Sequence, residues 1–254
     1  MTISSKTKTV IITGGTQGIG AAIAQAFYQN GMSVVIGARR DNGFVKELGK
    51  RARFFPIDVR RESDHREIIE QTLKWTKRLD VYVNCAGFSK WCSLRGVDEE
   101  LWNEMIDTNL KGTFLGCKAA AEFLPEGGAI INVSSLAGKR GSANNSVYCI
   151  SKFGVTGLTQ ALAKELGARG IRVNSVCPVY VKTKGLLEAL SKKDSPSGGK
   201  DAAIYLQQFA AQNAALNRLP TAKEVAGVCV FLASPEASAI TGQSINVDCG
   251  VLPQ

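Results

Sequence analysis

Short apolar runs rich in β-branched residues alternate with longer segments of helical periodicity along the chain. Most of the runs are almost continuously apolar, as in parallel strands that are buried on both faces. The first helix is predicted from about Gly18 to Asn30, with Gly31 placed to end it. This alternation, with no internal repeat, predicts one α/β domain over residues 1–254, a doubly wound parallel sheet of about seven strands. The predicted strands are Thr9–Thr13, Ser33–Ile36, Arg53–Ile57, Val81–Asn84, Ala129–Val133, Arg172–Val176 and Ser244–Val247.

Composition and charge narrow the class of protein. The 254 residues are 44% hydrophobic, and no stretch approaches the roughly 20 apolar residues that a membrane span needs. The N-terminus has no apolar leader, so we expect a soluble, cytoplasmic protein with no membrane partner. The net charge of +9 is expected to be mainly solvated surface, with attraction of anionic ligands as the alternative. No nucleic-acid-binding signature accompanies the charge, so no nucleic-acid partner is expected.

Cysteine and histidine usage argues against two kinds of site. The seven cysteines are scattered and never form C-x-x-C, so they are expected to be reduced and mostly buried. The only histidine is His65, and the polar run RRESDHREIIE around it predicts a solvated helix. One histidine cannot form a His cluster, so no metal site is expected, and a Ser-His-Asp hydrolase is hard to build.

The run VIITGGTQGIG (10–20) joins the first strand to the first helix through several glycines. Glycine allows a tight turn and a close approach to a ligand, and the helix N-terminus behind it presents free N–H groups to a pyrophosphate. The spacing is G-x-x-x-G-x-G, which differs from the commonest dinucleotide fingerprint. A dinucleotide is the ligand that this turn predicts. The candidate contact residues are Gly14, Thr16, Gln17, Gly18, Ile19 and Gly20.

The end of the second strand favours NADP(H) over NAD(H). Dinucleotide folds that use NAD place an acidic residue near this point to bind the ribose 2′-hydroxyl. Here the run SVVIGARR ends in Arg39 and Arg40 instead. A guanidinium can bind a 2′-phosphate through two parallel hydrogen bonds, whereas the alternative is that both arginines are merely exposed.

The run YCISK (148–152) places a tyrosine four residues before a lysine. On a helix these side chains are neighbours, and such a pair often arises by chance. Other runs give it a context: VNCAG (83–87), DTNLKG (107–112) with Asn109 early in a helix, and INVSSLAG (131–138) with Ser135 after a strand.

Together with TGGTQGIG, Asp58-Val59 and Pro178-x-x-x-x-Thr183, these runs resemble the short-chain dehydrogenase/reductase family over nearly the whole chain. The resemblance implies a Rossmann-type domain, an oxidoreductase activity on a C=O or CH–OH group, and a homotetramer. It matches Asn109, Ser135, Tyr148 and Lys152 to the catalytic tetrad. It matches Asp58 and Val59 to the pair that contacts the adenine. It assigns further cofactor contacts to Asn84, Ala86, Gly87, Tyr148, Lys152, Val181 and Thr183.

Ketone reduction explains why such a tetrad is needed. A free phenol titrates near ~10, so a nearby ammonium, together with the positive oxidised nicotinamide, is expected to lower the pKa of Tyr148 toward the working range. Lys152 is expected to bond the nicotinamide ribose as well, and the Ser135 hydroxyl to steady the carbonyl oxygen. Asn109 is expected to hold a water that passes protons from Lys152 to solvent.

The substrate is left open by the sequence. The leading reading is a free small-molecule ketone or secondary alcohol; the alternatives are a 3-oxoacyl group on an acyl-carrier protein and a non-catalytic NADP-sensing protein. Residues at about 184–217 are expected to form a substrate lid, with a poorly ordered centre at 191–201 that buries little surface. Two positions depart from the family, because Val179 and Cys249 stand where glycine is usual.

Overall fold

A computed structural model describes residues 7–253 and contains a single parallel sheet of seven strands. The strand order is β3-β2-β1-β4-β5-β6-β7, so the winding direction reverses between β1 and β4. The predicted α/β doubly wound class is therefore confirmed. The strands are β1 Thr9–Thr13, β2 Ser33–Ala38, β3 Ala52–Pro56, β4 Val81–Asn84, β5 Ala129–Val133, β6 Arg172–Pro178 and β7 Ser244–Val247.

Four of the seven strands have the predicted bounds, and the other three differ by one or two residues. Strand β2 extends to Ala38 because its last residues pair with Phe55 and Pro56 of β3. Strand β6 extends to Pro178, which pairs with Val247 of β7. A neighbouring strand, which the local sequence does not contain, decides where these strands end.

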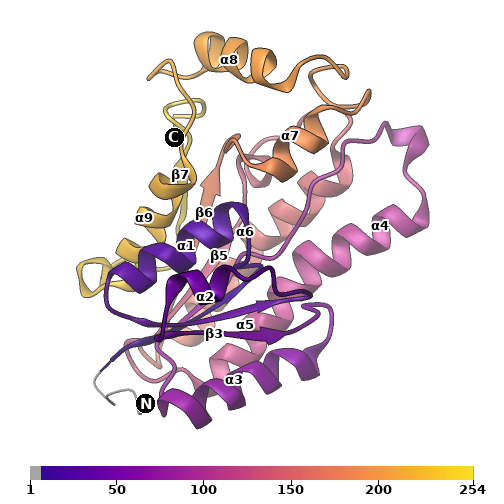
Figure 1. Ribbon diagram of the computed structural model, residues 1–254. Helices are drawn as coiled ribbons and strands as arrows, with labels where there is room; N and C mark the ends of the chain where they lie inside the picture. Colours follow the sequence, from indigo (N-terminus) through magenta and orange to yellow (C-terminus); the bar gives the residue numbers. More distant parts are fainter. Residues whose placement is uncertain (1–6, 254) are drawn as a thin grey trace.

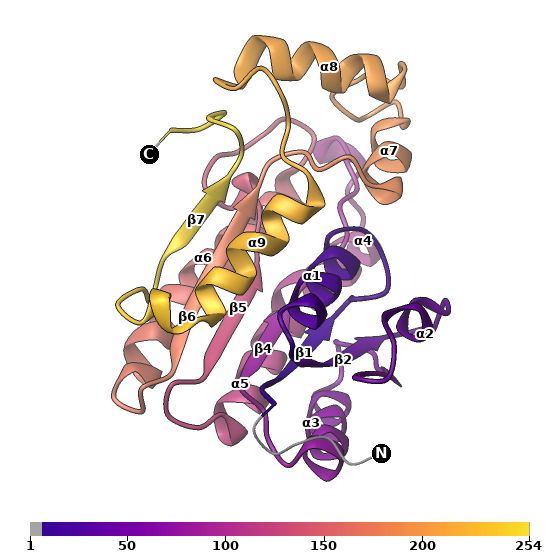
Figure 2. The same cartoon turned by 60° about the vertical axis from the view of Figure 1, so that its left-hand side comes forward.

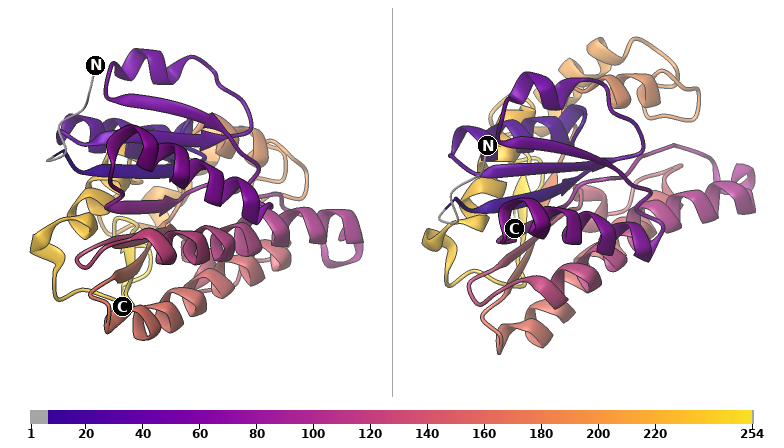
Figure 3. Two further views of the ribbon diagram at one scale, coloured as in Figure 1. Left: turned by 90° about the horizontal axis from the view of Figure 1, so that it is seen from below. Right: turned by 60° about the horizontal axis from the view of Figure 1, so that its bottom comes forward.

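Nine helices among the described residues surround the sheet: α1 Gly18–Gln29, α2 Phe44–Leu48, α3 Glu62–Thr76, α4 Glu99–Ile106, α5 Gly112–Phe123, α6 Ser146–Gly167, α7 Lys184–Leu190, α8 Ala202–Asn213 and α9 Ala222–Ala233. Figure 2 shows α1 and α9 in front of the sheet, and the views in Figure 3 show helices on both of its sides. Within residues 7–253, none of these helices has both the length and the apolar character that a membrane crossing requires.

Alternate residues of each strand feed two separate cores, one on each face of the sheet. In β1, Val10 and Ile12 pack with Ile23 and Phe27 of α1. Between them, Ile11 points to the opposite face, where α3, α5 and α6 supply the second core. Because both faces are covered, the strands are apolar almost throughout, which is the pattern that the sequence displayed.

Helices α7 and α8 stand apart from the layered body, beyond the carboxyl ends of the strands (Figure 1). The connection between them, residues 191–201, has no regular helix and buries little surface, as expected: nine of its eleven residues are exposed, and Ser195 and Ser197 are the exceptions. Ser195 and Ser197 are 5% and 6% exposed, and both hydroxyls donate to the Leu190 carbonyl, at 2.5 and 2.6 Å. The two serines are buried because they satisfy the free end of α7.

The prediction that His65 lies on a solvated surface was wrong. His65 is on the first turn of α3, and its side chain is 0% exposed. Its ring nitrogens lie 2.7 Å from the Tyr82 hydroxyl and 2.8 Å from the Val59 carbonyl oxygen. The polar residues around it belong to the outer face of α3, whereas His65 shares the inner face with Ile68 and Ile69.

Candidate active site

The glycine turn between β1 and α1 leaves no room for side chains. Gly14 has a φ of +69°, and a Cβ there would lie 2.7 Å from the Ala86 Cα. A Cβ on Gly20 would lie 2.2 Å from the Gly14 carbonyl oxygen. Gly18, with a φ of +56°, faces the side chain of Thr183. The turn therefore brings three chain segments into contact: its own, the loop after β4 and the loop after β6.

The N-terminus of α1 is open to an anion. Its N-cap residue, Gln17, makes no side-chain capping hydrogen bond, and the first turn contains no acidic residue. The first amide groups of a helix carry partial positive charge and lack intrahelical partners. Together with the close backbone approach at Gly14, this arrangement fits a pyrophosphate.

Arg39 and Arg40 follow β2 beside this turn. The Asn42 amide donates to the Thr16 carbonyl at 2.8 Å, which ties the loop after β2 to the glycine turn. Both arginines are exposed, and within residues 7–253 neither guanidinium has a hydrogen-bond or ion-pair partner. Two unpaired cations thus border the turn where a 2′-phosphate would need them.

Asp58 and Val59 follow β3 in a tightly held loop. The Asp58 carboxylate accepts hydrogen bonds from the Arg60 guanidinium, and this contact lowers its pKa to about 2. Val59 is buried, and a Cβ on Gly112 of α5 would lie 2.9 Å from its side chain. The loop is therefore packed between α3 and α5.

Tyr148 and Lys152 lie on the first two turns of α6, which begins at Ser146. Lys152 is 6% exposed, and its Nζ donates to the Val133 carbonyl at the end of β5, at 2.8 Å. Burial lowers the pKa of this ammonium to about 8. Its other two N–H donors have no partner within residues 7–253, so they are free for a ligand.

In the protein without cofactor, the pKa of Tyr148 is not lowered, so the lysine alone does not have the effect that is expected of the lysine and the oxidised nicotinamide together. Burial raises the pKa of Tyr148 to about 12, while a hydrogen bond with the Ser135 hydroxyl acts in the opposite direction. The Lys152 Nζ lies 5.7 Å from the centre of the phenol ring. In the protein alone, the cost of desolvating a phenolate exceeds the attraction of this ammonium.

Asn109 is inside a helix rather than early in one. It lies in a π-helical turn, Asp107–Lys111, that joins α4 to α5. Its side-chain oxygen accepts from the Phe88 amide at 3.0 Å, and its nitrogen donates to the Phe88 carbonyl at 2.9 Å and to Ser151 at 3.2 Å. The amide is thus occupied in joining the loop after β4 to α6.

The remaining predicted cofactor residues divide into two groups. Ala86 and Gly87 lie at the expected edge: Ala86 against Gly14, and Gly87 between the Asn109 amide and the Lys152 ammonium. By contrast, the Asn84 side chain turns into the protein and donates to Asn132 at 2.9 Å. The Val181 side chain is 4% exposed and packs in the core beside α1 and α9.

Several residues that hold this site were not identified from the sequence. The Thr13 hydroxyl accepts from the backbone amides of Cys85 and Ala86, at 3.1 and 3.3 Å. The Val133 carbonyl, which holds Lys152, is contributed by a backbone atom and therefore leaves no mark in the sequence. Tyr180 could have been found from the sequence, because it is an aromatic residue shortly after the sixth predicted strand, where the strand ends meet.

Aromatic rings gather beside the tetrad. Tyr180 follows β6, and its ring centre lies 4.9 Å from that of Phe209 and 6.1 Å from that of Tyr205, both on α8. The ring centre of Trp91, in the loop after β4, lies 6.4 Å from that of Tyr180, and its indole nitrogen is buried without a hydrogen-bond partner among residues 7–253. These rings join α8 to the loops that follow β4 and β6.

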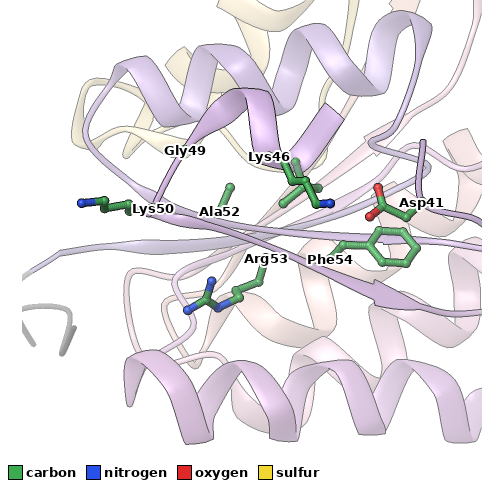
Figure 4. A pocket seen from close by; sticks show the side chains of 8 residues that line it. Asp41, Lys46, Gly49, Lys50, Ala52, Arg53 and Phe54 are labelled. Carbon is green, nitrogen blue, oxygen red and sulfur yellow. The ribbon is translucent and has the colours of Figure 1, made fainter. Parts of the chain in front are cut away.

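A separate hollow of about 410 Å³ lies at the outer edge of the sheet, beside α2 and β3. Figure 4 shows the cationic ends of Lys46, Lys50 and Arg53 pointing in different directions rather than toward a shared point. The hollow therefore has no converging chemical groups and does not form part of the site.

Comparison with known proteins finds relatives that match almost the whole chain. The sequence model of a family described as "Enoyl-(Acyl carrier protein) reductase" matches residues 14–252. The chain is 35% identical to a short-chain dehydrogenase/reductase from Armillaria gallica, over 98% of this chain and 97% of the relative. It is 34% identical to the 3-oxoacyl-acyl-carrier-protein reductase FabG of Thermotoga maritima, over 96% and 98%.

Solved structures of similar proteins have the same fold. An actinorhodin polyketide ketoreductase crystallised with NADPH superposes with a TM-score of 0.89 at 31% identity, over 99% of both chains. A ligand-free aldohexose dehydrogenase from Thermoplasma acidophilum superposes with a TM-score of 0.87 at 29% identity, over 98% of both. The predicted family is confirmed: the chain belongs to the short-chain dehydrogenase/reductases.

Proposed function

We propose that this protein is an NADP(H)-dependent oxidoreductase that interconverts a small-molecule ketone and a secondary alcohol. The observation that carries the proposal is the buried Lys152 ammonium. It lies beside the Tyr148 phenol and the Ser135 hydroxyl, and two of its N–H groups have no hydrogen-bond partner within residues 7–253. Burying a cation is costly, so a cation kept next to a proton-bearing phenol favours catalysis over a structural role. The nicotinamide, when bound, supplies or accepts the hydride.

The residues of the tetrad would then have separate tasks. Tyr148 gives a proton to the carbonyl oxygen in reduction and removes it in oxidation. Ser135 donates a hydrogen bond to the same oxygen as negative charge develops there. Lys152 uses its free N–H donors on the nicotinamide ribose and replaces the proton that Tyr148 loses. Asn109, whose side-chain amide makes three hydrogen bonds, fixes the Phe88 backbone against α6.

The cofactor preference rests on Arg39 and Arg40. Their unpaired guanidinium groups beside the glycine turn suit a 2′-phosphate, and no carboxylate takes their place at the end of β2. The NADPH in the related ketoreductase structure supports the same choice. Gly14, Thr16, Gln17, Gly18, Ile19 and Gly20 would hold the pyrophosphate, with Thr183 and the Val181 backbone beside the nicotinamide.

We also propose that residues 184–217 act as the substrate lid of a single domain in a cytoplasmic protein. The rings of Tyr180, Tyr205 and Phe209 connect this segment to the loop that follows β6. An aromatic lining of this kind favours an apolar or aromatic substrate over a small charged one.

A second function has support from the relatives. FabG of Thermotoga maritima is a reductase of 3-oxoacyl groups on a carrier protein. By resemblance to such reductases, the only residue of this chain that matches a typical carrier-docking position is Arg169. Its guanidinium, however, donates to the Ala121 carbonyl at 2.6 Å and therefore caps the end of α5. We therefore rank a free substrate first.

Replacing Tyr148 by Phe tests the proposed chemistry. The variant is expected to fold and bind NADPH but to lose nearly all turnover, because only the proton-transferring hydroxyl is removed. NADPH absorbance would be followed with a panel of free ketones and with 3-oxoacyl thioesters on a carrier protein. A variant that keeps more than about a tenth of wild-type kcat, a barrier change of only ~1.4 kcal/mol, would contradict the assignment. Turnover of carrier thioesters alone would favour the second function, and NADPH binding without turnover would indicate a sensing protein.

Lys152→Met is expected to stabilise the cofactor-free protein while abolishing turnover. The pKa of Lys152 falls from 10.5 to about 8, so burial of its charge opposes folding at pH 7. Removing it should raise the free energy of unfolding by about 2 kcal/mol, after the loss of the Val133 hydrogen bond. The gain should shrink between about pH 8 and pH 10.5, because the unfolded chain holds the proton more tightly there. Urea unfolding measures both effects, with Lys164→Met, an exposed lysine of the same helix, as control. A loss of stability at pH 7 would refute this account.

Arg39→Asp is expected to move the cofactor preference from NADP(H) toward NAD(H) by on the order of tenfold or more, because a carboxylate repels a 2′-phosphate. The measurement is the ratio of kcat/KM with the two cofactors. Lys164→Asp makes the same charge change at an exposed position of α6, twelve residues beyond Lys152, and should leave the ratio unchanged. A wild-type enzyme that prefers NAD(H) would disprove the proposed preference.

We propose that the protein is a homotetramer, with α5 and α6 forming one interface. On these helices Phe114 is 46% exposed, whereas Leu115 is buried and Leu158 and Leu162 pack against the core. Ile150 and Phe153 add exposed apolar area on α6. Sedimentation should therefore give a tetramer for the wild type and a smaller species for Phe153→Lys; a stable wild-type monomer at micromolar concentration would refute the proposal.

A further inference from the structure

His65 is a polar residue enclosed in the core for which the chemistry above has no use. Its Nε2 lies 2.8 Å from the Val59 carbonyl oxygen, which can only accept, so Nε2 carries the proton. The Nδ1 of the neutral ring then accepts from the Tyr82 hydroxyl, at 2.7 Å. Burial lowers the pKa of His65 and thereby favours this neutral form. One tautomer satisfies both partners.

The residue before it completes a clamp. The Asp64 carboxylate accepts from the Asp58 amide at 2.8 Å. Two consecutive residues of the first turn of α3 thus hold the backbone of two consecutive loop residues, one through an N–H group and the other through a carbonyl. From the opposite side, Gly112 of α5 allows close packing against Val59. The loop that follows β3 consequently has little freedom to rotate its peptide groups.

We propose that His65, fixed by Tyr82, is a positioning residue: by holding the carbonyl of the peptide group that follows Val59, it keeps the segment Asp58-Val59 in the orientation that receives the adenine end of the dinucleotide. The inference rests on the proposed cofactor role of Asp58 and Val59. Because the buried His65 ring bonds both the Tyr82 hydroxyl of β4 and the Val59 carbonyl, it fixes the loop relative to β4. A purely apolar side chain at this position would fill the same space but leave the carbonyl without a donor.

The clamp depends on the neutral imidazole. The titratable groups near it are Glu62 and Asp64 of α3, Asp58 of the loop, Tyr82 of β4, and Cys117 of α5, which acts on Tyr82. The carboxylates favour a protonated ring, but the effect of burial is larger. In acid, a protonated Nδ1 would point a second donor at the Tyr82 hydroxyl, whose own proton would then lack an acceptor. Dinucleotide affinity is therefore expected to fall as the pH drops below about 6.5, the pKa of an ordinary histidine.

The test is a fluorescence titration of the full chain with NADPH, which reads binding without turnover. His65→Leu is expected to weaken binding at least tenfold while kcat at saturating NADPH changes less than threefold. His65→Gln should stay within threefold of the wild type, because its amide can donate to the Val59 carbonyl, and should lack the part of the acid dependence that is due to the imidazole. Thr72→Val removes a buried hydrogen bond elsewhere on α3, between the Thr72 hydroxyl and the Ile68 carbonyl, and should leave binding unchanged.

Three outcomes would overturn the proposal: unchanged affinity in His65→Leu, an equal loss in Thr72→Val, or a loss in His65→Gln as large as in His65→Leu. If His65→Leu does not fold, Tyr82→Phe gives the same test by removing one oxygen atom; a severalfold weaker affinity supports the proposal and an unchanged affinity overturns it. NADPH binding that depends on His65 without turnover of any ketone would sink the proposed function alone. If only NADH binds, the same variants are read with NADH, since both dinucleotides share the adenine end. Failure to bind either dinucleotide overturns both proposals.

Discussion

The chain leaving β1 passes so near the chain leaving β4 that a Cβ on Gly14 would lie 2.7 Å from the Ala86 Cα. This contact sits where the strand order reverses, and there the two loops turn toward opposite faces of the sheet. The Thr13 hydroxyl reinforces it by accepting from the amides of Cys85 and Ala86. The N-terminus of α1 and the Gly87 backbone directly follow the two segments that meet here, and the Lys152 ammonium, held by the Val133 carbonyl, lies beside Gly87.

The site combines a rigid apolar base with polar groups that lack full solvation. Beneath it, the two cores fix the strand ends on both faces. Above them, Lys152 keeps its charge although burial lowers its pKa to about 8, and Tyr148 keeps its proton because burial raises its pKa to about 12. Each shift opposes ionisation in the protein alone. A bound cationic nicotinamide would favour the phenolate, so ionisation of Tyr148 is expected to accompany cofactor binding.

The sequence predicted those features that depend on local pattern. Parallel strands buried on both faces give continuous apolar runs in the sequence. The glycines between the first strand and the first helix indicate a tight turn whose backbone comes close to a ligand. It did not predict partners that are far away along the chain. His65 looked solvated because the residues around it are polar, and only the packing of α3 against Tyr82 of β4 shows that its side chain faces inward. For the same reason, the anchoring of Asn109 to Phe88 and of Lys152 to the Val133 carbonyl could not be read from the sequence.

Two positions at which the family usually has glycine are accommodated in different ways. Val179 has no left-handed backbone; β6 continues to Pro178, and the Val179 amide contacts the Val247 carbonyl at 3.4 Å. Cys249 does adopt a left-handed conformation, with a φ of +55°, which costs a side-chain-bearing residue roughly 1–2 kcal/mol. The two side chains share a small apolar cluster with Leu136 and Cys177, so burial offsets part of that cost. This cluster anchors both ends of the lid region, because Val179 precedes the lid and Cys249 accepts from the Leu216 amide. Side chains at these positions thus replace the flexibility of glycine with packing next to the tetrad.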